Sequence, residues 1–201
     1  KSANKKAAKI ADDAYVVFVA DVYGVDTRPT NSEEAAAAAG RMRSGDRQQL
    51  RDRINVALEA FRERADGRSL DPRRMVAVGF CFGGGTVLEL ARSGSDIPAV
   101  ISFHGNLDTP RPAEKGDIQS KILVLHGGED PYVPGEQVKA FHQEMRASET
   151  EDLQLVVFGD TVHSFTNPNA DSDGARYHER SSKRAFRYMD DLIGELFGTN
   201  Q

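Results

Sequence analysis

The sequence predicts an α/β fold in which a mostly parallel sheet is covered by helices on both faces. Short apolar runs rich in β-branched residues alternate with segments whose apolar residues recur at helical spacing. The segments between the runs are long enough to hold the helical crossovers that parallel strands require. There is no internal repeat and no low-complexity linker, so residues 1–201 are expected to form a single domain.

Five apolar runs are expected to be strands. The first, AYVVFVADVYG from Ala14, is continuously apolar at its start, as in a strand buried on both faces. Met75–Val78 is a short buried strand, and the other three runs are PAVISFHG, KILVLHGG and LQLVVFGD. Helices are expected between and around them. The residues that indicate these helices are 1–13, the alanine run 35–39 after residues 31–34 that suit a capped first turn, the stripe Leu50–Phe61, Thr86–Ala91, Gly135–Ala147 and the apolar stripe Ala185–Phe197.

Composition excludes several classes of function. Twenty-six basic and thirty-one acidic residues give a net charge of −5, which does not favour a nucleic-acid partner. The arginine-rich stretches 41–53 and 62–74 are interleaved with acidic residues and are expected to be solvated helix faces. No apolar stretch is long enough to cross a membrane, and a cytoplasmic location is expected. The single cysteine excludes an internal disulfide.

That cysteine, Cys81, lies in the stretch Gly79-Phe-Cys-Phe-Gly83 between a predicted strand and a predicted helix. A nucleophile elbow has this pattern, because the nucleophile sits in a strained turn and its neighbours two positions away must be small. The helix N-terminus would favour the thiolate, and the Phe82 N–H would face a developing oxyanion. The alternatives are a buried packing cysteine and a phosphate-binding glycine turn, although no complete phosphate-loop motif is present.

Asp130 and His163 are the expected partners of this thiol. Asp130 follows the run KILVLHGG, and His163 follows LQLVVFGD, so both lie past the carboxyl ends of strands. A thiol nucleophile needs a base, and the base needs a carboxylate that fixes its tautomer. The order nucleophile, acid, histidine strengthens this interpretation.

The remaining histidines have weaker signals. His104 and His126 also end strands, and His104 is a weaker candidate for the base. His142 and His178 are expected at the surface. No spacing of histidine and acidic residues indicates a metal site, and no cofactor is expected. Four aromatic residues are expected either to line an apolar pocket or to belong to the core: Phe80, Phe82, Phe103 and Tyr132.

These motifs together resemble the dienelactone hydrolase family, within the α/β-hydrolase fold. The similar parts are DVYG at 21–24, GFCFGG at 79–84, HGGEDPYVP at 126–134 and HSF at 163–165. The resemblance implies cofactor-free hydrolysis of a small ester or lactone, with Cys81 as nucleophile, His163 as general base and Asp130 as its orienting acid.

Two departures from the family pattern are visible. The positions at which the archetypal enzyme has carboxylate-binding arginines are Val25 and Asn167 here, which favours a less charged substrate. Family members also begin with strands that residues 1–13 do not supply. We therefore expect this sequence to be a C-terminal portion, with a separate N-terminal segment completing the sheet and supplying a second oxyanion donor.

Two rival interpretations remain open. The first is a non-catalytic binding protein that keeps the hydrolase fold, since fold does not imply function. The second is a thiol redox protein that uses Cys81, although the chain has no resolving cysteine.

Overall fold

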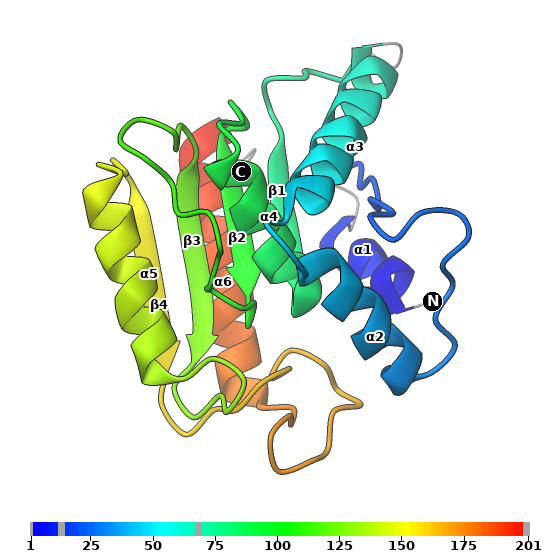
Figure 1. Ribbon diagram of the computed structural model, residues 1–201, viewed down its shortest axis with the longest axis vertical. Helices are drawn as coiled ribbons and strands as arrows, with labels where there is room; N and C mark the ends of the chain where they lie inside the picture. The colour runs from blue at the N-terminus through cyan, green and yellow to red at the C-terminus, as the bar shows by residue number, and fades with distance from the viewer. Residues whose placement is uncertain (1, 12–14, 67–69, 199–201) are drawn as a thin grey trace.

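The computed structural model describes residues 2–11, 15–66 and 70–198, and its centre is a parallel sheet (Figure 1). Four strands lie side by side in the order β1-β2-β3-β4, and every pair is parallel. Their bounds are β1 Val76–Phe80, β2 Ala99–Phe103, β3 Lys121–Gly127 and β4 Leu153–Phe158. The four strand predictions from Met75 onward are therefore confirmed, and so is the mostly parallel α/β class.

Helices cover both faces of this sheet, as predicted. Their bounds are α1 Ser2–Ala11, α2 Ser32–Arg43, α3 Gln48–Asp66, α4 Phe82–Arg92, α5 Gly135–Ala147 and α6 Glu179–Phe197. The Asn31 side chain caps α2 by accepting a hydrogen bond of 2.9 Å from the Glu34 N–H. Residues 1, 12 and 13 of the expected first helix lie outside the described residues.

Two apolar clusters, one on each face of the sheet, hold the layers together. One joins α3, α4 and α5 to the sheet through residues such as Leu58, Leu88 and Phe141. The other joins α6 to the opposite face through Ala185, Met189, Leu192 and Ile193, with Ile10 of α1 packed at its edge. The apolar stripes predicted for the helices at 50–61 and 185–197 therefore lie in these two clusters.

The prediction of a strand starting at Ala14 is wrong for the part that the structure describes. Residues 15–20 form no strand, and the side chains of Tyr15–Val19 are 36–56% exposed; Ala14 itself lies outside the described residues. Among the described residues β1 and β4 are the edges of the sheet, so this run has no strand beside it. An apolar β-branched run becomes a strand only when a neighbouring strand pairs with its backbone.

The expectation of solvated arginines is wrong for Arg47 and Arg51. Both are buried against Glu89 of α4, whose carboxylate has no exposed surface, at 3.1 and 2.8 Å. Arg92 contacts the same carboxylate at 3.2 Å and also pairs with Glu144 of α5 at 2.8 Å. A buried charge needs partners, and this network supplies them while joining α3, α4 and α5.

No helix among the described residues has the combination of length and hydropathy that a membrane-spanning segment requires.

The turn between β1 and α4 depends on a close approach of two glycines. A Cβ on Gly79 would lie 1.9 Å from the Gly83 carbonyl oxygen, closer than any real contact. A Cβ on Gly83 would meet nothing within 4 Å. The expectation that a side chain is excluded is therefore confirmed at Gly79 and wrong at Gly83. It is the backbone carbonyl of Gly83, and not the space around its Cα, that leaves no room for a Cβ on Gly79.

This asymmetry predicts opposite outcomes for two matched substitutions. Gly79→Ala should destabilise the fold severely, because the new methyl group meets backbone atoms that cannot move without opening the β1–α4 turn. Gly83→Ala should fold normally, and because alanine favours helix over glycine by about 1 kcal/mol, its free energy of unfolding should not fall. Urea denaturation of both variants tests this. Equal stabilities would contradict the account of the turn.

Candidate active site

Cys81 occupies the strained position of the turn. It lies between the last residue of β1 and the first residue of α4. Its backbone has φ 51° and ψ −119°, a conformation that residues other than glycine rarely adopt. Its N–H donates to the Phe103 carbonyl oxygen at 3.1 Å, which fixes the turn to β2. Phe82 is the first residue of α4, and N–H groups of a first helical turn have no acceptor within the helix.

Asp130 and His163 come together next to Cys81. They lie in the loops after β3 and β4, and the His163 Nδ1 is 2.8 Å from an Asp130 carboxylate oxygen. The other carboxylate oxygen of the buried Asp130 accepts the Tyr132 N–H at 2.9 Å. The carboxylate is thus fixed by its own loop, and it holds the imidazole so that Nε2 is available to the thiol.

His104 lies closer to Cys81 than the sequence suggested. The register of β1 and β2 pairs Phe80 with Phe103, so the residues that directly follow the two strands, Cys81 and His104, are also neighbours. The His104 Nδ1 is 3.4 Å from the Cys81 Sγ and 3.3 Å from its N–H. The His104 Nε2 is 2.8 Å from the Thr166 hydroxyl, and the ring is almost completely buried. Two imidazoles therefore flank one thiol.

The charges of these groups depend on one another. Burial raises the pKa of Cys81, but hydrogen bonds and charges of His104 and His163 outweigh it and lower the pKa to about 4. Burial lowers the pKa of His163, yet Asp130 and Cys81 raise it to about 9. Burial lowers the pKa of His104. At neutral pH the site therefore holds a thiolate, an imidazolium at His163 and a neutral His104.

Three further polar groups reach the thiol region and gave no clear sequence signal. The Ser164 hydroxyl is 3.3 Å from the Cys81 Sγ, and Ser164 itself has a φ of 55°. Lys6 of α1 lies over the Phe80 ring at 4.2 Å, and burial lowers its pKa while Cys81 raises it. Thr166 follows His163 by three residues in the same loop. The positions of Ser164 and Thr166 depend on loop conformation, and that of Lys6 depends on how α1 packs next to Phe80. Periodicity in a sequence encodes neither.

The four aromatic candidates separate into two groups. Phe103 has no exposed surface and stacks on Phe80 with ring centres 4.6 Å apart, so Phe103 belongs to the core and does not line a pocket. Phe82 is half-buried and stacks on Tyr23 of the DVYG segment at 5.1 Å. Tyr132 is 61% exposed and meets the His163 ring edge-on at 5.2 Å. Tyr132 and Phe82 therefore border the site on the solvent side.

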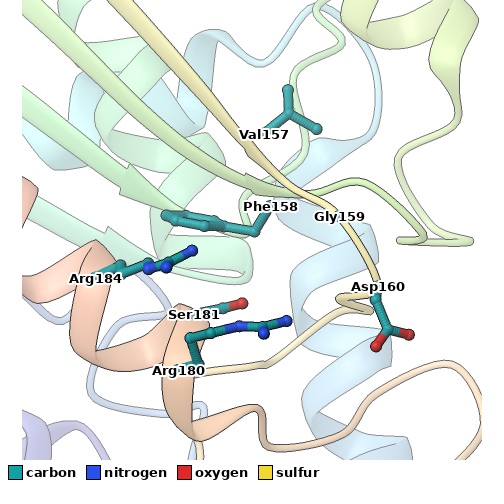
Figure 2. Close-up of a pocket in the computed structure, with 7 residues that line it drawn as sticks. All are labelled: Val157, Phe158, Gly159, Asp160, Arg180, Ser181 and Arg184. Carbon is teal, nitrogen blue, oxygen red and sulfur yellow. The ribbon is translucent and has the colours of Figure 1, made fainter.

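Other polar residues lie outside this set of contacts. A hollow of about 540 Å³ lies between the end of β4 and the start of α6 (Figure 2), lined by Asp160, Arg180 and Arg184 among others, and none of the three triad candidates borders it. Asp108 pairs with Arg47, and the His126 Nδ1 is buried without a hydrogen-bond partner among the described residues. Asp130 is thus the carboxylate that contacts His163.

The chain is similar to several known proteins. A model of the dienelactone hydrolase family matches residues 1–197. An uncharacterised protein of Caenorhabditis elegans is 37% identical over 155 residues, covering 74% of this chain and 94% of the relative. A Salmonella typhimurium protein, proposed to be a carboxymethylenebutenolidase, is 27% identical over 200 residues, covering 94% of this chain and 70% of that protein.

A solved structure of a dienelactone hydrolase-like protein is also similar to this chain. The crystal structure of a dienelactone hydrolase-like promiscuous phosphotriesterase from metagenomic libraries is 36% identical, with a TM-score of 0.85. The match covers 97% of this chain and 80% of the phosphotriesterase chain. The family match spans nearly the whole sequence and accompanies the α/β-hydrolase fold. The chain belongs to the dienelactone hydrolase family, and it is a hydrolase of ester bonds.

Proposed function

We propose that the chain hydrolyses a small carboxylic ester or lactone through an acyl-enzyme on Cys81. The observation that carries the proposal is the contact between Asp130, His163 and Cys81 beyond the carboxyl ends of strands β3, β4 and β1 of one parallel sheet. A thiolate paired with an imidazolium is both a nucleophile and, through its partner, a general acid.

The proposed cycle has two acyl-transfer steps. The Cys81 thiolate attacks the substrate carbonyl carbon, and the Phe82 N–H stabilises the oxyanion, an interaction worth about 2.7–4 kcal/mol for one donor. The His163 imidazolium then protonates the leaving alkoxide as the carbon–oxygen bond breaks, which leaves a thioester. Neutral His163 takes a proton from water, hydroxide attacks the thioester, and the acid product leaves as the Cys81–His163 pair is restored.

Two positions near the site favour a less charged substrate than an anionic dienelactone. Val25 is largely exposed, and Asn167 follows His163 by four residues, so neither position supplies a cation for a substrate carboxylate. The structural relative described as a promiscuous phosphotriesterase makes neutral phosphate triesters a second candidate class, because attack by the same thiolate at phosphorus needs the same three groups.

A separate N-terminal segment completing the sheet is also part of the proposal. In the described residues β1 is an edge strand, and the apolar run at 15–19 is partly exposed, with Phe18 stacked on Phe61 of α3. A further strand paired with β1 would cover this edge and could supply a second oxyanion N–H. The intact mass of the protein purified from its natural source tests this part. A lone 201-residue species with full esterase activity would contradict it.

The nucleophile is tested by substitution at Cys81. Rapid mixing with a p-nitrophenyl ester should give an acyl burst in the parent and none in Cys81→Ala, whose turnover should fall by several orders of magnitude, as loss of a nucleophile costs about 10⁶ in kcat in a serine protease. Cys81→Ser should fold but react slowly, because serine is not ionised before attack. An alanine variant with the parental rate would make Cys81 a packing residue. A neutral aryl phosphotriester in the same assay tests the second substrate class.

The thiolate predicts a distinctive pH dependence. Alkylation of Cys81 by iodoacetamide should stay fast down to mildly acidic pH and fall only as pH drops through about 4, whereas an ordinary thiol loses reactivity below about 8.5. Ester turnover should fall as pH rises through about 9, because His163 then loses the proton that the leaving group needs.

Two matched variants give the control for this profile. Asp130→Asn removes the carboxylate that holds the imidazolium, so the pKa of His163 should fall and the alkylation inflection should move upward. Asp160 is an exposed carboxylate in the hollow beside α6, so Asp160→Asn should leave the inflection in place. A parental inflection near that of a free thiol would contradict the ion pair.

A further inference from the structure

Three potential metal ligands converge at the thiol, which the sequence spacing did not indicate. Among the described residues, Cys81, His104 and His163 form a group whose ligand atoms all lie within 4.8 Å of one another. In a tetrahedral zinc site with bonds of 2.0–2.3 Å, such atoms are about 3.3–3.6 Å apart. The separation of 3.4 Å between the Cys81 Sγ and the His104 Nδ1 already matches this value, and no pair of ligand atoms would need to close by more than about 1.5 Å.

Each imidazole is held from behind by an oxygen. The His163 Nδ1 bonds the Asp130 carboxylate, and the His104 Nε2 bonds the Thr166 hydroxyl, both at 2.8 Å. When each distal nitrogen donates to its oxygen, the other nitrogen of each ring carries a lone pair near the sulfur. The His104 Nδ1 also accepts the Cys81 N–H at 3.3 Å, and zinc would replace that bond while the N–H keeps the Phe103 carbonyl oxygen as acceptor. Metal-binding histidines usually have this support, which fixes the tautomer and the ring plane.

The donor set also suits the chemistry of zinc. One thiolate and two imidazoles are borderline-soft ligands, and three protein ligands with one open position are typical of accessible zinc sites. The two rings meet edge-on with centres 5.2 Å apart, and His104 and Asp130 are buried, so the cluster is held by the core. Hydrolysis through the triad uses one histidine, and the second histidine is what makes a three-ligand site.

We propose that Cys81, His104 and His163 bind one zinc ion, with Asp130 and Thr166 orienting the two imidazoles. Binding forms one zinc–sulfur and two zinc–nitrogen bonds and releases the proton that the Cys81–His163 pair shares. Zinc would then occupy the nucleophile and the base together and inhibit ester hydrolysis reversibly. The inhibition rests on the proposed function, whereas the binding does not.

Binding is measured without substrate. Zinc affinity is determined by competition with a chromophoric chelator, and cobalt(II), added to the apo chain, should give a thiolate-to-cobalt charge-transfer band with one equivalent bound. Cys81→Ala should lose the band, and His104→Phe should lose both the band and the tight zinc affinity. Thr166→Val should bind zinc roughly tenfold to a hundredfold more weakly, the usual effect of losing a supporting hydrogen bond. His142→Gln, which removes an exposed histidine on α5, should bind like the parent.

The result that overturns the proposal is a parent chain without the charge-transfer band, or a folded His104→Phe chain with parental zinc affinity. Circular dichroism checks the fold of each variant, and His104→Gln replaces the phenylalanine variant if that one misfolds. If neither folds, the affinity of Thr166→Val decides, and parental affinity there overturns the proposal. Ester turnover is assayed separately: a chain that binds zinc but lacks turnover fails the proposed function alone, and one with turnover but no zinc site fails this inference alone.

Discussion

The contact between Gly79 and the Gly83 carbonyl is the constraint on which the site depends. It brings the start of α4 so close to the end of β1 that Cys81 must adopt a φ of 51°. Such a conformation costs about 1–3 kcal/mol and persists only when its surroundings impose it. The hydrogen bond from the Cys81 N–H to the Phe103 carbonyl is part of that imposition. The thiol is thereby held beyond the sheet edge, beside the loops that carry Asp130 and His163.

The helix on the other side of the elbow is held by buried charge. Glu89 lies near the end of α4 and is neutralised by Arg47, Arg51 and Arg92, and Arg92 continues the network to Glu144. Breaking a buried ion pair by removing one partner typically costs 3–5 kcal/mol, so α4 cannot shift without exposing or isolating a charge. Although the network lies near the far end of α4, it therefore keeps the N-terminus of the helix in place next to the thiol.

The sequence predicted what local pattern encodes and missed what depends on neighbours. Strands β1–β4, the elbow at Cys81 and the loop positions of Asp130 and His163 follow from apolar periodicity and turn chemistry. The run at 15–20 failed as a strand because pairing needs a partner that composition cannot supply. The burial of Arg47 depends on a glutamate 42 positions away. The expectation that residues 1–201 form one domain stays a prediction.

His104 shows how much register adds to such an analysis. Taken alone, a histidine at the end of a strand is a weak candidate, and the sequence ranks it below His163. Once β1 and β2 are known to pair in parallel with Phe80 opposite Phe103, the residues that follow must meet, and Cys81 gains a second imidazole at 3.4 Å. Thr166 can donate to or accept from the His104 Nε2, so this ring can face the sulfur with a proton or with a lone pair. A site built this way can stabilise a thiolate and, with the other tautomer, bind a cation.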